Sequence, residues 1–181
     1  MNIQVSKNIV VLAGSPRKNG NSEALAAQFK KGAESAGKTV TIFHVAHMQF
    51  RGCIGCGYCQ KHTGRCVHND DMTEALAAIE NADVLVWASP VYYFSVTGYL
   101  KLAIDRLYPL EIGTTKQLAI LLTCADETSD TADGALEIYH SAAAYYEWDK
   151  AGVVIATGVA DIGDINGHEA LEQARKLGQE I

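Results

Sequence analysis

Short apolar runs alternate along this chain with amphipathic stretches, and this alternation limits the fold more than any other feature. The apolar runs have the length of single β-strands and begin near residues 9, 40, 84, 118 and 153. The stretches between them carry apolar residues at helical spacing, such as Leu25, Phe29 and Ala33. Strands that alternate with helices pair in parallel through right-handed crossovers. The sequence therefore predicts an α/β fold with three layers and a doubly wound, five-stranded parallel sheet.

The length and composition indicate one globular unit. The chain has 181 residues, of which 48% are hydrophobic and 20% are charged, a balance that is typical of a folded domain. No repeat or linker divides it. We therefore expect a single domain over residues 1–181, with an insertion at about residues 47–70 that has neither helical nor strand periodicity.

The charge and the cysteines restrict the class of protein. A formal net charge of −6 and the absence of a basic run argue against a nucleic-acid surface. No apolar run is long enough to span a membrane and no secretory signal is evident, so we expect a cytoplasmic protein without membrane partners. Its five cysteines are then expected to be reduced thiols, metal ligands or redox centres.

The segment Gly14–Ser22, between the first strand and the first helix, has the features of a phosphate-binding loop. A helix N-terminus leaves N–H groups unpaired and carries a partial positive charge, which stabilises an anion. Arg17 adds a cation with a fork of donors suited to phosphate. Short polar side chains add further donors: Ser15, Asn19, Asn21 and Ser22. The alternative is an ordinary turn in which Ser22 is the N-cap.

Two more loops should meet this segment, because ligands of doubly wound folds bind beyond the carboxyl ends of the strands. One loop offers aromatic faces for a planar ring and holds Pro90, Val91, Tyr92, Tyr93 and Phe94. The other could line the far edge of that ring and holds Thr123, Cys124 and Ala125. A subunit contact is the alternative for the aromatic residues, and an inert packed thiol is the favoured interpretation of Cys124.

The insertion concentrates thiols that could surround a small metal centre. It contains four of the five cysteines: Cys53, Cys56, Cys59 and Cys66. The residues alone leave several interpretations open, namely an iron–sulfur cluster, a four-thiolate zinc site, a redox disulfide between two of the cysteines, or a loop without metal.

A helix is predicted to begin where the insertion ends. Asp71 and Glu74 have the spacing of a capping box, in which two side chains satisfy backbone N–H groups at a helix start. Met72, Leu76 and Ile79 follow at helical spacing. We therefore expect Asp71 to cap this helix.

Several of these segments resemble the NAD(P)H-dependent FMN reductases, and the resemblance extends over essentially the whole chain. The residues that carry it are Gly-Ser-Pro-Arg-Lys-Asn-Gly-Asn-Ser at 14–22, Ser-Pro-Val-Tyr-Tyr at 89–93, and Thr-Gly-Val and Gly-Asp-Ile within 157–165. The cysteine spacing is similar to that of the iron–sulfur flavoproteins, in which it binds a [4Fe–4S] cluster.

The resemblance implies a flavodoxin-like fold of strand order 2-1-3-4-5 and a homodimer or homotetramer. It also implies an FMN cofactor, with the phosphate held by Ser15, Arg17, Asn19, Asn21 and Ser22 and the ribityl chain and ring held by residues 90–94 and 123–125. The cluster ligands would be Cys53, Cys56, Cys59 and Cys66.

The first functional hypothesis is an FMN-dependent oxidoreductase. It takes hydride from NAD(P)H and passes electrons to a quinone, a nitro or azo compound, a free flavin or iron. No catalytic side chain is expected, because the flavin carries the chemistry. The alternative is an iron–sulfur flavoprotein that carries electrons between redox proteins without a nicotinamide. A third hypothesis is a flavin-binding or zinc-binding interaction protein without turnover.

Overall fold

A five-stranded parallel sheet forms the centre of the molecule in this computed structural model, which describes residues 6–62 and 64–181. The strands are β1 (Asn8–Ala13), β2 (Thr39–His44), β3 (Val84–Pro90), β4 (Gln117–Thr123) and β5 (Asp149–Ala156). Every neighbouring pair is parallel, and the order across the sheet is β2-β1-β3-β4-β5. The predicted α/β class, flavodoxin-like topology and strand order 2-1-3-4-5 are thus confirmed.

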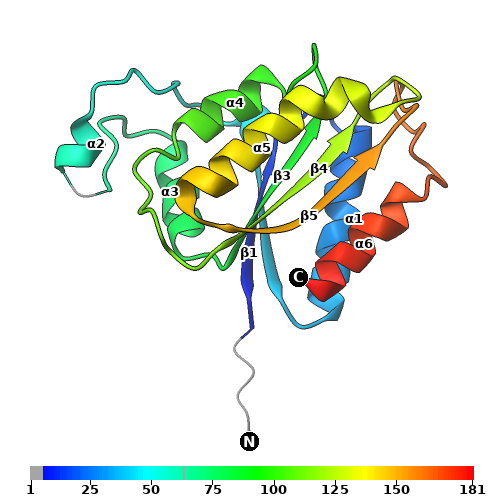
Figure 1. Cartoon of the computed structure of the whole chain (residues 1–181), viewed down its shortest axis with the longest axis horizontal. Helices are drawn as coiled ribbons and strands as arrows, with labels where there is room; N and C mark the ends of the chain where they lie inside the picture. Colours follow the sequence, from blue (N-terminus) through cyan, green and yellow to red (C-terminus); the bar gives the residue numbers. More distant parts are fainter. Residues whose placement is uncertain (1–5, 63) are drawn as a thin grey trace, which may run out of the picture.

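Helices cover both faces of the sheet (Figure 1). One face packs against α1 (Asn21–Ser35) and α6 (Ala170–Glu180), and the other against α3 (Met72–Glu80), α4 (Gly98–Asp105) and α5 (Asp133–Tyr146). Short helices are η1 (Val45–His47), α2 (Tyr58–Lys61) and η2 (Ser129–Ala132). None of the helices in the described ranges combines the length and apolarity needed to cross a bilayer.

Two apolar cores result from the alternation of side chains along the strands. Val10 and Leu12 of β1 belong to the core beneath α3, α4 and α5, whereas Ile9 and Val11 belong to the core beneath α1 and α6. All four side chains are buried, which explains why this strand appears in the sequence as a continuous apolar run.

The insertion extends away from the sheet, beyond α3 and α4 (Figure 1). Its backbone turns sharply at Gly55 and Gly57, whose φ angles are +64° and +65°. This left-handed conformation is accessible to glycine at little cost, so the two glycines allow the chain to turn between successive cysteines.

The start of α3 differs from the prediction. Asp71 makes no capping hydrogen bond, and its carboxylate instead accepts one from the backbone N–H of Gln49 at 2.6 Å. The preceding residue, Asp70, accepts from the N–H of Met72 at 3.2 Å. Asp71 therefore occupies the N-cap position, as predicted, but its side chain does not cap the helix, because its carboxylate binds the backbone of Gln49 near the start of the insertion.

Helices α1 and α6 approach each other so closely that only glycine fits at their contact. A Cβ atom on Gly32 would overlap the carbonyl oxygen of Arg175, and one on Gly178 would overlap the carbonyl oxygen of Phe29. Backbone therefore packs on backbone. Because α1 follows the loop after β1 and α6 follows the loop after β5, this contact fixes the distance between those two loops.

We expect Gly178→Ala to lower the free energy of unfolding by about 1–3 kcal/mol, because the added methyl group forces the two helices apart. Gly98→Ala is the matched control: a Cβ at Gly98, the first residue of α4, meets no atom within 4 Å. Equilibrium unfolding in urea, followed by circular dichroism, measures both variants. Equal stability of the two variants would contradict this account of the contact.

Candidate functional site

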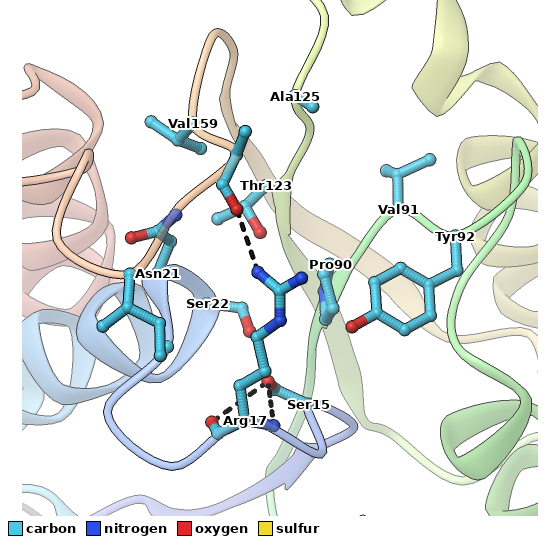
Figure 2. A pocket seen from close by; sticks show the side chains of 13 residues that line it. Ser15, Arg17, Asn21, Ser22, Pro90, Val91, Tyr92, Thr123, Ala125 and Val159 are labelled. Carbon is cyan, nitrogen blue, oxygen red and sulfur yellow. Dashed lines mark hydrogen bonds between the residues drawn. The ribbon is translucent and has the colours of Figure 1, made fainter.

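A cavity of about 220 Å³ lies at the carboxyl ends of the strands (Figure 2). Its wall comes from the loops after β1, β3, β4 and β5, with the residues Ser15, Arg17, Gly20, Asn21, Ser22, Pro90, Val91, Tyr92, Thr123, Ala125, Val159, Ala160 and Ile162. The three loops that the sequence analysis placed together therefore do meet at one cavity.

The N-terminal end of α1 opens onto this cavity. Its N-cap is Gly20, which has no side chain to cap the first turn, and Ser22 lies inside the helix with 2% of its surface exposed. Ser22 is thus not the N-cap, contrary to the alternative of an ordinary capped turn. Uncapped N–H groups and the positive end of the helix dipole favour an anion at this position.

Arg17 crosses the cavity from the loop after β1. Its Nη1 atom donates a hydrogen bond to the carbonyl oxygen of Ala160 at 2.9 Å, and its backbone N–H donates to Ser15 Oγ at 3.1 Å. Figure 2 shows the guanidinium between the β1 and β5 loops. The cavity therefore contains a solvent-exposed cation close to the N-terminal end of α1.

The side chain of Asn21 connects the two loops. Its Nδ2 donates to the carbonyl oxygen of Asp161 at 2.9 Å, and its Oδ1 accepts from the N–H of Gly163 at 3.2 Å. Both ends of the amide are thus engaged by the loop after β5. Asn21 contributes to the wall of the cavity by fixing that loop.

Two of the predicted residues, Asn19 and Cys124, lie outside the cavity wall. Asn19 has a φ of +57°, and its N–H donates to the carboxylate of Glu23, so it lines a separate groove. Cys124 is 3% exposed, and its Sγ donates to the carbonyl oxygen of Ala156 at 3.7 Å. Burial raises the pKa of this thiol, which agrees with the interpretation of an inert packed cysteine.

Tyr93 and Phe94 also lie outside the cavity wall, at the tip of a tight turn. The backbones of Tyr92 and Ser95 exchange hydrogen bonds of 2.8 and 3.2 Å. Between them, Tyr93 and Phe94 have φ angles of +48° and +66°, the pattern of a type I′ turn. Tyr93 is 95% exposed. Of the three aromatic residues, Tyr92 alone lines the cavity, and the other two point into solvent at a cost in backbone strain.

Four wall residues were not among the predicted site residues: Gly20, Val159, Ala160 and Ile162. Of these, Gly20 lies within the predicted phosphate loop and Val159 within the Thr-Gly-Val motif of the family resemblance. Val159, Ala160 and Ile162 belong to the loop after β5, whose strand ends at the same edge of the sheet. The position of this loop after a parallel strand was a signal that it could line the site. Valine and isoleucine, the residue types at 159 and 162, do not by themselves mark a ligand site.

A second cavity, of about 150 Å³, is lined by all four cysteines of the insertion together with His68, Asp105, Arg106 and Tyr108. The thiols are free. Two buried nitrogens at this cavity, His68 Nε2 and Arg106 Nε, have no hydrogen-bond partner in the described part of the chain. Thiolates or sulfides of a bound centre would supply acceptors there, so the residues fit a thiolate-bound centre.

Arg106 joins both ends of the insertion to α4. Its Nη1 and Nη2 donate to the two carboxylate oxygens of Asp70 at 2.8 and 3.0 Å, and Nη1 also donates to the carbonyl oxygen of Arg51 at 2.6 Å. Burial acts to raise the pKa of Asp70, but these hydrogen bonds and one from the N–H of Arg51 lower it below its ordinary value. The carboxylate and the guanidinium are therefore a charged pair.

The two cavities have no wall residue in common. The cysteine cavity lies at the C-terminal end of α4, at Asp105 and Arg106, whereas the larger cavity lies at the carboxyl ends of the strands. A ligand in one cavity is therefore not in contact with the wall of the other within a single chain.

Known proteins of similar sequence are named for an iron–sulfur centre and a flavin. A protein of Methanocaldococcus jannaschii named iron-sulfur flavoprotein is 30% identical over 96% of this chain and 94% of its own length. An iron-sulfur flavoprotein of Archaeoglobus fulgidus is 40% identical over 100 residues, which are 55% of this chain and 45% of that protein. The match thus spans less than half of the Archaeoglobus protein.

Solved structures and a family comparison agree with the fold. The NAD(P)H:quinone oxidoreductase from Methanothermobacter marburgensis superposes with a TM-score of 0.70 at 20% identity, over 97% of this chain and 96% of that chain. Residues 7–143 match the family described as NADPH-dependent FMN reductase. The chain therefore belongs to this family of FMN-dependent oxidoreductases. Within its sequence relatives, it is similar over nearly its whole length to an iron–sulfur flavoprotein.

Proposed function

We propose that this chain binds FMN in the larger cavity, takes hydride from NAD(P)H and passes electrons to a small acceptor such as a quinone, a nitro or azo compound, a free flavin or iron. The observation that carries the proposal is one open cavity with a cation and a helix N-terminus at the same end. FMN supplies the hydride chemistry when bound, and the protein supplies binding and orientation.

The phosphate of FMN would bind at the start of α1. The backbone N–H groups of the first turn and the hydroxyls of Ser15 and Ser22 are suitable donors, and Arg17 supplies the neutralising charge. The Arg17 guanidinium uses one N–H group on the carbonyl oxygen of Ala160, so it can bind the phosphate with its other donors while it remains bonded to the loop after β5. Arg17 thereby links FMN binding to the position of the loop after β5.

The ring of FMN would lie towards the open side of the cavity. Its volume of about 220 Å³ is below the roughly 300–1,000 Å³ of sites that enclose a drug-sized ligand. The phosphate end can therefore be enclosed while the ring remains accessible beside Pro90, Val91 and Tyr92. Such access is what a hydride donor and a small acceptor require. The quinone oxidoreductase of similar fold supports a quinone as one acceptor class.

Arg17→Ala is expected to weaken FMN binding roughly 10- to 100-fold, because hydrogen bonds to a charged group contribute about 1.5–3 kcal/mol. Quenching of flavin fluorescence during titration of the apoprotein measures the Kd. Lys18→Ala is the matched control, since Lys18 is an exposed cation of the same loop that does not line the cavity. An equal Kd for the two variants would count against the phosphate position.

A second candidate function rests on the cysteine cavity. All four cysteines line one cavity, and no three His, Cys, Asp or Glu side chains within residues 6–62 and 64–181 are grouped as a single-ion site. A centre larger than one zinc ion, such as a [4Fe–4S] cluster, suits this arrangement. The chain would then carry electrons between redox proteins, with Cys53, Cys56, Cys59 and Cys66 as ligands.

The two functions differ in their response to Cys56→Ser. Anaerobically purified wild-type protein is expected to contain about four irons with sulfide, and Cys56→Ser to lose most of them. Cys124→Ser, which alters a buried cysteine outside both cavities, is the control. NADPH oxidation by the wild-type protein that persists in Cys56→Ser favours the reductase, whereas wild-type protein that holds the cluster and oxidises no NADPH favours the carrier. Zinc in place of iron would contradict the cluster.

The proposed homodimer or homotetramer has support in an exposed apolar groove. The groove lies between α4, α5 and the cysteine insertion, and its wall includes Ile104, Tyr108, Ile138, Ala142 and Tyr145. Tyr108 and Tyr145 are 45% and 50% exposed. Apolar surface of this kind, rimmed by polar residues, is typical of an interface between subunits.

We expect Tyr145→Glu to shift the protein to a monomer, because it places a charge in the apolar groove. Light scattering coupled to size-exclusion chromatography measures the mass. Tyr93→Ser, in the exposed turn after β3, is the comparison variant and should leave the mass unchanged. Dissociation by Tyr93→Ser and not by Tyr145→Glu would instead assign the subunit contact to the turn.

A further inference from the structure

Arg106 is a buried cation whose Nε atom has no hydrogen-bond partner among the described residues. Only 1% of its surface is exposed, and it follows the last residue of α4. Asp70 and the carbonyl oxygen of Arg51 occupy its Nη1 and Nη2 atoms, which fixes the plane of the guanidinium. Its Nε is buried and has no partner among the described residues. A buried donor of this kind is costly unless a ligand supplies the acceptor.

Arg106 forms part of the wall of the cysteine cavity. Arg106 and Cys66 both line this cavity, whereas Asp70 does not. The cavity wall therefore includes the positive member of the ion pair and not the negative member.

We infer that Arg106 is a positioning residue for the four-cysteine centre, where its fixed charge and its Nε–H raise the reduction potential of a cluster bound there. The inference rests on the proposed iron–sulfur function. Four thiolates give a [4Fe–4S] centre a net negative charge, and one-electron reduction makes that charge more negative. A nearby cation stabilises the reduced form, and hydrogen bonds to sulfur act in the same direction.

The test uses two variants with opposite predicted effects. Arg106→Met removes the cation and should decrease the equilibrium constant for one-electron reduction roughly tenfold or more, a shift of about −59 mV per factor of ten. Asp70→Asn keeps Arg106 and removes the negative charge behind it, so the potential should rise. General damage to the insertion would move both potentials in the same direction or remove the cluster from both variants.

The measurement is an anaerobic redox titration with dithionite, followed by electron paramagnetic resonance, on protein whose iron and sulfide have been determined. Arg106→Lys retains the charge and should recover part of the shift. Arg65→Met is the control, because Arg65 precedes Cys66 but is exposed and does not line the cavity, so solvent screens its charge.

The outcomes distinguish a failure of the inference from a failure of the proposed iron–sulfur function. Wild-type protein that binds no iron and sulfide overturns the iron–sulfur function, and the inference fails with it. Wild-type protein with a cluster but with unchanged potentials in both variants overturns the inference alone. If Arg106→Met does not fold, Asp70→Asn decides: a raised potential supports the inference, and an unchanged or lowered potential overturns it.

Discussion

The reversal of strand order beside β1 determines where this chain can hold a ligand. Because β2 and β3 lie on opposite sides of β1, the loops after β1 and β3 diverge and leave space at their ends. The junction is rigid: Gly14 donates its N–H to Ala88 at 2.8 Å and accepts from the Thr97 hydroxyl at 2.7 Å. Strand pairing thus fixes the cavity, and α1 directs its N-terminal end into it.

A charged pair has the corresponding role in the insertion, which lacks sheet structure of its own. Asp70 and Arg106 hold the two ends of the cysteine segment against α4, so the thiols are arranged by a partly buried ion pair in which Arg106 is the buried member. Breaking such a pair leaves an uncompensated buried charge, which is strongly destabilising. The two centres of this chain therefore depend on different kinds of interaction, and they lie in separate cavities.

Periodicity and connection rules predicted the parallel sheet and the loops that form the cavity, because these depend on local pattern and on the handedness of crossovers, whereas the strand order was implied by the family resemblance. Side-chain direction was harder to predict. Tyr93 and Phe94 are suitable residue types for a flavin site, yet the left-handed turn sends them into solvent. The role of Asp70 was missed because its partner, Arg106, lies 36 positions away and meets it only in the folded chain.

The central claim is that FMN binds at the carboxyl ends of the strands with its phosphate at the start of α1. A crystal structure of the protein grown anaerobically with FMN tests this most directly. The account predicts density for the phosphate at the first turn of α1, within reach of Arg17, and density for the ring beside Tyr92. Flavin bound elsewhere, such as the groove between α4 and α5, with this cavity filled by solvent, would contradict it.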